Sequence, residues 1–91
     1  MEDNDAKYWL NKWNREFCPD YLTPIFTGFC DLGPTTRGRT SFYGRCYGNG
    51  TDSCRYGKIA MSNRLHSDWR IKATLWHEFC HHWEWVETGK H

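Results

Sequence analysis

The segment from Ser67 to Gly89 constrains the fold most, because it predicts one long helix. Between these two residues the sequence contains neither Pro nor Gly, the residues that most strongly oppose a helix. Ser67 has a side chain suited to cap the first turn, and Gly89 suits the position just after the last turn. One stripe of apolar residues recurs at helical spacing: Ile71, Leu75, Phe79 and Val86. The sequence therefore predicts a helix over residues 68–88 that covers a core.

A second helix is predicted near the N-terminus by the same kind of spacing. Its apolar positions fall on one face: Ala6, Trp9, Leu10, Trp13 and Phe17. Asp3 or Asn4 can cap its start, and Pro19 ends it soon after Cys18.

The middle of the chain shows no helical period and contains many glycines. Three of its segments are rich in β-branched and aromatic side chains and predict strands at residues 24–32, 39–47 and 56–61. Three strands in succession favour an antiparallel meander. Gly44 and Gly57 either weaken these strands or mark bulges. The predicted fold class is α+β, with an N-terminal helix, a small three-stranded antiparallel sheet and a C-terminal helix.

The length of 91 residues allows one domain, and burial alone leaves a domain of this size only marginally stable. Aromatic residues make up 18% of the sequence and include six Trp, so dense aromatic packing can strengthen a small core. A bound metal would add to that stability. We therefore expect a single domain over residues 1–91.

The net charge of +1 gives no overall field that would draw the chain to a nucleic acid or a membrane surface. No apolar run is long enough to span a bilayer, so no membrane partner is expected. The chain has an odd number of cysteines, five, so they cannot all pair in disulfides within it. Its first residues are acidic, unlike those of a secretory signal. These features predict reduced thiols and a cytoplasmic location.

His77 and His81 are four positions apart on the predicted helix and therefore share one face. Two imidazoles placed in this way can bind one zinc ion at Zn–N distances of about 2.0–2.1 Å. Glu78 follows the first His and lies close to such a metal without binding it, so it can take a proton from water there. This is the H-E-x-x-H motif of zinc peptidases. A chance match or a purely structural role is the alternative.

The residues around this motif resemble the SprT-like (Spartan-type) zinc metallopeptidase family. The detailed likeness runs from Lys58 to Gly89. It starts with an Ile-containing strand followed by Ser and Leu at 58–65, and continues with Thr-Leu-Trp-His-Glu-Phe-Cys-His at 74–81. Trp85 and the final Gly, four and eight residues past the second His, also fit the family pattern. An N-terminal helix and three strands before the motif extend the likeness over most of the chain.

The resemblance implies a minimal zincin-like fold whose C-terminal helix binds zinc. It implies His77 and His81 as ligands and Glu78 as the general base of an endopeptidase that cleaves protein or peptide substrates. The family's third ligand is a His a little over a dozen residues beyond the second. This chain has His91 only ten residues beyond His81, and we take it as the candidate third ligand.

The position of His91 leaves several alternatives open. A helix that runs to Thr88 climbs about 1.5 Å per residue away from the metal, and little chain remains to return. The helix can end early, the chain can be truncated at its C-terminus, or another residue or water can complete the zinc shell. Two functions therefore stand beside the peptidase: a non-catalytic metal- or nucleic-acid-binding module of the same fold, and an inactive fragment of a larger peptidase.

Other His and Cys residues give weaker signals. His82 faces away from the predicted metal and suits a surface or partly packed position, and His66 is expected to be solvated. Cys80 points off the ligand face and is expected to be a small core residue. The remaining cysteines lack the C-x-x-C spacing of a structural zinc cluster: Cys18, Cys30, Cys46 and Cys54.

The middle segment is locally basic, with five cations against the single acid Asp52 over residues 37–58. The cations are Arg37, Arg39, Arg45, Arg55 and Lys58. The aromatic residues among them are Phe42, Tyr43, Tyr47 and Tyr56. Such a segment can grip a DNA backbone and stack bases, and the resemblance keeps this function open because Spartan-type members act on proteins crosslinked to DNA. The alternative is a solvated sheet face with aromatic packing beneath it.

Overall fold

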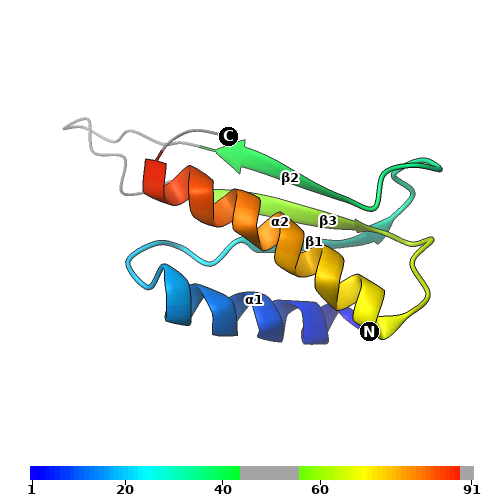
Figure 1. The fold of residues 1–91 in the computed structure, drawn as a ribbon, viewed down its shortest axis with the longest axis horizontal. Coiled ribbons are helices and arrows are strands. Elements are labelled where there is room, and N and C mark those ends of the chain that lie inside the picture. The colour runs from blue at the N-terminus through cyan, green and yellow to red at the C-terminus, as the bar shows by residue number, and fades with distance from the viewer. Residues whose placement is uncertain (44–55, 89–91) are drawn as a thin grey trace.

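The computed structural model describes residues 1–43 and 56–88. They form two helices and three strands in the order α1 (Asp3–Phe17), β1 (Ile25–Cys30), β2 (Gly38–Tyr43), β3 (Tyr56–Ser62) and α2 (Asp68–Thr88). Figure 1 shows α2 lying along the sheet beside β2 and β3, with α1 next to it on the side of β1. The predicted α+β class, with one helix before the strands and one after them, is confirmed.

Helix α1 begins one residue earlier than the predicted cap allows. Its first residue is Asp3, and the backbone N–H of Glu2 donates a hydrogen bond of 3.0 Å to Oδ2 of Asp5. Glu2 therefore occupies the N-cap position, and the prediction of Asp3 or Asn4 there is wrong. The predicted apolar face is confirmed, because its central members are buried: Ala6, Leu10 and Trp13.

The sheet is mixed, and the predicted antiparallel meander is wrong. The strand order is β1-β3-β2, with β1 parallel to β3 and β2 antiparallel to β3. Strands that follow one another in sequence are spatial neighbours only about two-thirds of the time. Here the most deeply buried strand, β3, takes the centre, where Ile59 and Met61 are fully buried against the helices.

The strand ends differ from the prediction for local reasons. The first strand, predicted over 24–32, ends at Cys30 because Asp31 accepts a 2.9 Å hydrogen bond from the N–H of Gly33 and starts a turn. Gly33 has a φ of 91°, which favours glycine. The second strand begins at Gly38. The part of its predicted range beyond position 43 lies outside the described residues.

The irregular point in the sheet lies at Gly28. This residue has a φ of 113°, and the pairing register with β3 shifts between Phe26 and Gly28. Gly57, a predicted weak point or bulge, pairs regularly with Phe42. A Cβ at Gly57 would stand 3.1 Å from Nδ1 of His82, so this glycine makes room for α2. Gly44 is outside the part of the chain that the structure describes.

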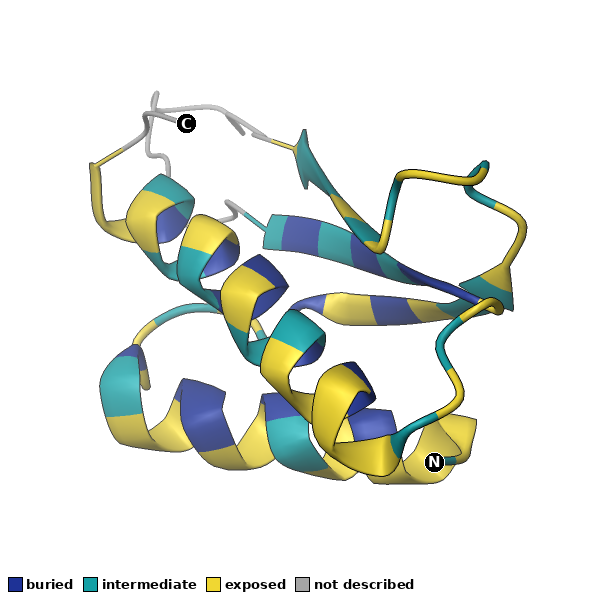
Figure 2. Ribbon diagram, turned by 45° about the vertical axis from the view of Figure 1, so that its right-hand side comes forward, coloured by how far each residue is buried: buried dark blue, intermediate teal, exposed yellow. Residues whose placement is uncertain are grey.

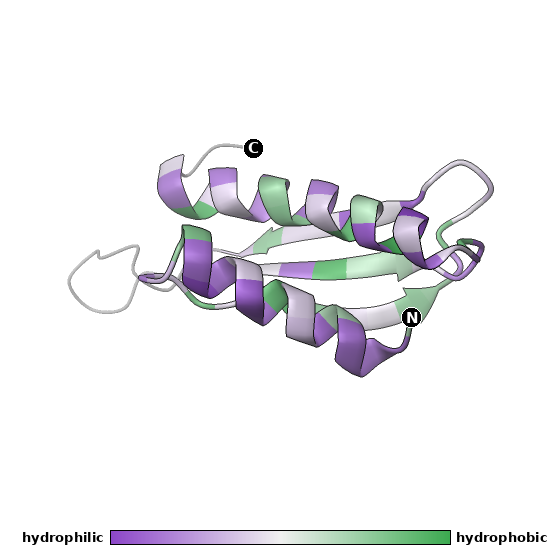
Figure 3. Cartoon of the chain, turned by 60° about the horizontal axis from the view of Figure 1, so that its bottom comes forward, coloured by the Kyte–Doolittle hydropathy of each residue, from purple (hydrophilic) through white to green (hydrophobic). Residues whose placement is uncertain are grey.

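One hydrophobic core lies between the helices and the sheet, as the dark blue inner surfaces in Figure 2 show. The predicted stripe of α2 is confirmed as part of it, since all four members are buried: Ile71, Leu75, Phe79 and Val86. Figure 3 shows hydrophilic segments alternating with hydrophobic ones along both helices, as one-sided burial requires. Within residues 1–43 and 56–88, neither helix combines the length and apolar character needed to cross a membrane.

The thiols of Cys18 and Cys30 are expected to differ in reactivity by about 100-fold or more. Burial raises the pKa of Cys18 to about 11, and its Sγ donates a 3.0 Å hydrogen bond to Oδ1 of Asn14. A rise of two pKa units lowers the reactive thiolate fraction about 100-fold, whereas Cys30 is exposed. Timed alkylation with iodoacetamide, followed by peptide mass mapping, measures both rates. Similar rates in the folded chain would contradict this packing, and denaturant should make the two rates equal.

Candidate metal centre

Helix α2 brings His77 and His81 together on its solvent side. They lie one helical turn apart, and their Nε2 atoms are 3.1 Å from each other. The ring centroids are 4.7 Å apart and the ring planes are nearly perpendicular, at 87°. Both side chains are exposed, so an ion or a substrate can reach them directly from solvent. The two Nε2 atoms therefore converge on one accessible point, as the i, i+4 spacing predicted.

The separation of these two nitrogens fits a shared zinc ion. Two nitrogens at about 2.0–2.1 Å from one tetrahedral zinc ion stand roughly 3.3 Å apart. The observed 3.1 Å between His77 and His81 is close to this value. The same distance also fits a hydrogen bond between a protonated and an unprotonated ring nitrogen. The distance is therefore compatible with a shared metal ion or with a direct hydrogen bond between the two rings.

Glu78 leaves α2 on a neighbouring side and turns toward the sheet. Its side chain is buried, with 6% of the residue exposed. Oε1 accepts a 2.7 Å hydrogen bond from the hydroxyl of Thr40 on β2. Within the part of the chain that the structure describes, Oε2 of Glu78 makes no hydrogen bond. One carboxylate oxygen is thus held by the sheet, and the other is available to a ligand.

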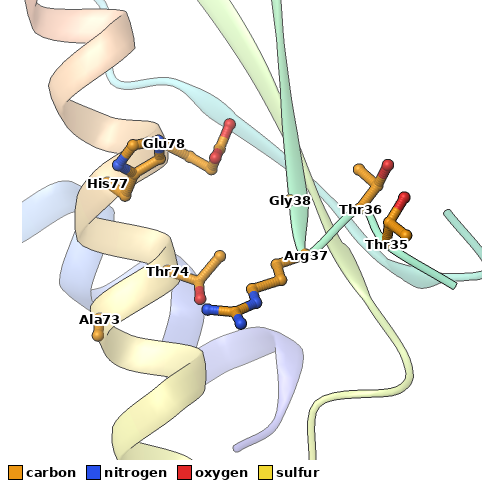
Figure 4. A pocket seen from close by; sticks show the side chains of 8 residues that line it. All are labelled: Thr35, Thr36, Arg37, Gly38, Ala73, Thr74, His77 and Glu78. Atoms are coloured by element: carbon orange, nitrogen blue, oxygen red, sulfur yellow. The ribbon is translucent and has the colours of Figure 1, made fainter. Parts of the chain in front are cut away.

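A cavity of about 460 Å³ lies between α2 and the start of β2 and includes both His77 and Glu78 in its wall. Figure 4 shows these two residues on the helix side and the Arg37 side chain reaching across from the strand side toward Thr74. The complete lining is Thr35, Thr36, Arg37, Gly38, Ala73, Thr74, His77 and Glu78. The wall of the cavity therefore contains a candidate metal ligand (His77), a carboxylate (Glu78) and a cation (Arg37).

No family model, curated protein or solved structure matches this chain. The resemblance of residues 58–89 to SprT-like peptidases therefore stays a prediction. The site has to be judged on the positions of its own side chains, above all those of His77, Glu78 and His81.

A third protein ligand is not found among residues 1–43 and 56–88, where no group of three His, Cys, Asp or Glu side chains is placed to hold a metal. His91, the predicted third ligand, lies outside these ranges, so its role stays a prediction. Gly89, the predicted helix stop, is outside them too. His66 is exposed just before α2, as expected for a solvated loop residue.

His82 is fully buried, so its predicted surface or partly packed position is wrong. Its Nε2 lies 3.2 Å from Oδ1 of Asn14 on α1, and burial lowers its pKa to about 4. The ring is therefore neutral at pH 7. Asn14 also donates a 2.8 Å hydrogen bond to the carbonyl of Tyr21. This polar network joins α2 to α1 on the side of the helix that faces away from the His77–His81 pair.

Cys80 is half-buried, so the prediction of a core position for it is wrong. Partial burial raises the pKa of its thiol. Its neighbour Phe79 takes the core position instead and is fully buried. The difference arises because Phe79 belongs to the buried stripe of α2, while the next residue is rotated by about 100° around the helix.

The predicted basic segment divides between two surfaces. Arg39 and Lys58 belong to the sheet face opposite the helices, since the alternate residues Gly57 and Ile59 on β3 are the buried ones. Arg37 instead lines the cavity beside α2. Arg45 and Arg55 lie outside the described ranges, and so does Tyr47.

The sequence did not single out Thr40 and Gly38 as site residues. Both sit on the side of β2 that faces α2, and both contact Glu78. The sequence around them indicates only that they share one face of a strand, because they are two positions apart. Which element that face meets depends on packing between segments 38 positions apart.

Proposed function

We propose that this chain is a zinc-dependent endopeptidase of the SprT-like kind, with His77 and His81 as zinc ligands and Glu78 as general base. One observation carries the proposal. The Nε2 atoms of His77 and His81 converge to 3.1 Å, and the carboxylate of Glu78 lines a cavity shared with His77. A structural pair of imidazoles alone would not require a carboxylate beside them in an open cavity.

The chemistry divides between the metal and the side chains. Bound zinc would lower the pKa of a coordinated water to about 7 and polarise the peptide carbonyl. Glu78 takes the proton of the attacking water on the carboxylate oxygen that Thr40 does not hold, and then donates it to the leaving amine. The guanidinium of Arg37, on the opposite wall of the cavity, would bind a carbonyl or carboxylate of the substrate. His91 remains the proposed third ligand.

Cleavage of a fluorescein-labelled unfolded protein tests this proposal. The purified chain loaded with one equivalent of zinc is expected to release labelled fragments. Cleavage should stop after treatment with 1,10-phenanthroline and should resume when zinc is added back. His77→Ala should be inactive under all these conditions. Activity that survives both the chelator and His77→Ala would contradict the proposal. A zinc-loaded wild-type chain without activity would favour the inactive fragment.

A second candidate function, DNA binding, is favoured by the exposed face of the sheet. Tyr43 and Tyr56 stack there, with ring centroids 5.2 Å apart and planes 14° from parallel. Nζ of Lys58 lies 5.0 Å from the centre of the Tyr43 ring, and the exposed Arg39 is on the same face. Aromatic surfaces among cations suit the stacking of bases and the neutralisation of phosphates. This face would add a nucleic-acid partner to the peptidase without involving α2.

Binding to a fluorescein-labelled single-stranded DNA, measured by anisotropy, tests the second candidate. Removing the cations with Arg39→Ala and Lys58→Ala should each weaken binding severalfold and reduce its dependence on salt. Lys12→Ala on α1, a matched loss of charge on the helical layer, should leave the affinity unchanged. Equal effects of all three substitutions would show that only net charge matters and would contradict a binding face on the sheet.

A further inference from the structure

Thr40 lies at the centre of the contact between β2 and Glu78. Its hydroxyl is 2.7 Å from Oε1 of Glu78 and 3.2 Å from the backbone carbonyl oxygen of the same residue. The hydroxyl has a single proton, and the shorter contact goes to the carboxylate, which is the stronger acceptor. Thr40 therefore fixes the orientation of the carboxylate.

Gly38 leaves the space in which that carboxylate lies. A Cβ at this position would stand 2.9 Å from Cγ and 3.2 Å from Cδ of Glu78, closer than side-chain atoms normally approach. It would also stand 3.2 Å from Cγ2 of Thr74. The side chain of Glu78 is thus confined by a glycine on one side and held by a hydroxyl at its end. Both restraints come from the face of β2 that meets α2.

We propose that Thr40 is a positioning residue for the reaction and that it acts through Glu78. By holding Oε1, it fixes the carboxylate of Glu78 at the wall of the cavity that His77 also lines and leaves Oε2 for a ligand. This inference rests on the proposed peptidase function. Without the hydroxyl, the carboxylate can rotate about its last side-chain bonds. Misplacement of a catalytic group by about 1 Å can lower a rate by up to 10²-fold.

Three variants separate positioning from a general loss of structure. Thr40→Val keeps the shape and removes the donor, and it is expected to lower kcat by roughly 10- to 100-fold with KM changed less than about threefold. Thr40→Ser restores a donor and should recover most of kcat. Gly38→Ala should also lower kcat, because its Cβ displaces the same carboxylate without removing the hydroxyl. Bound zinc should stay the same in all three.

The experiment measures kcat, KM, zinc content and the unfolding midpoint for the wild-type chain and these variants. A fall in kcat for Thr40→Val, with recovery in Thr40→Ser and unchanged zinc, is the expected result. Unchanged kcat in a folded Thr40→Val, or equal losses in the Val and Ser variants, would overturn the inference while leaving the peptidase intact. If Thr40→Val fails to fold, unchanged kcat in Gly38→Ala would overturn it. An inactive wild-type chain would overturn the inference together with the proposed function.

Discussion

Replacing Glu78 by Gln is expected to lower the rate of peptide cleavage by roughly 10²- to 10⁴-fold, the usual contribution of a general base. The amide has almost the same shape as the carboxylate and can still accept the hydrogen bond from Thr40, which is 2.7 Å long in the wild-type chain. It cannot accept a proton from water at neutral pH. The buried position of the side chain and the fold around it should therefore persist while catalysis is lost.

The matched control for this prediction is Glu84→Gln, which makes the same chemical change at an exposed position on α2. It should cleave the labelled substrate at the wild-type rate. Zinc content should be the same in the wild-type chain and both variants, because neither glutamate is a proposed ligand. Full activity in Glu78→Gln would show that Glu78 is not the general base and would contradict the proposed mechanism.

The second large effect is expected from Phe79→Ala. Phe79 is fully buried at the centre of the aromatic cluster, with ring centroids 5.8 Å from Trp13 and 5.7 Å from Trp76. Removing a buried Phe ring costs about 3–5 kcal/mol of folding free energy, because both apolar burial and packing are lost. A domain of this length has a total stability of roughly 5–14 kcal/mol. The variant should therefore lose a large part of its stability, and at the lower end of this range it would be partly unfolded at 37 °C.

Urea unfolding followed by circular dichroism measures this loss as a shift of the midpoint. Trp69→Ala is the control, since Trp69 is a larger aromatic residue on the same helix but is 69% exposed. Its effect should stay within about 0.5 kcal/mol. A similar small effect for Phe79→Ala would contradict the core described here. A large loss of stability in Trp69→Ala as well would mean that Trp69 makes a stabilising contact, which would contradict its exposed position.

The two helices could be predicted from sequence because their signals are local. The burial of Leu10 and Leu75 follows from spacing along one segment, and Asp68 directly follows the expected cap Ser67. The order of the strands could not be predicted in this way. It depends on which segments pair across the sheet, and the central place of β3 reflects the burial of Ile59 between two partner strands.

The same distinction between local and long-range contacts applies to the candidate site. The pairing of His77 with His81 is a property of one helical turn, so the sequence contains it. The anchoring of Glu78 by Thr40 joins residues 38 positions apart, and the contact of His82 with Asn14 joins residues 68 apart. Contacts of that kind leave no periodic trace. This is why the burial of His82 and the role of β2 emerged only from the packed structure.

Zinc stoichiometry of the purified chain, measured by elemental mass spectrometry after dialysis, tests the central claim most directly. We expect close to one zinc per chain, lost in His77→Ala and in His81→Ala but kept in His66→Ala, a matched substitution at an exposed His outside the site. Loss in His91→Ala as well would assign the third ligand. A wild-type chain without zinc, or one that keeps its zinc in both His77→Ala and His81→Ala, would contradict the metal centre on α2.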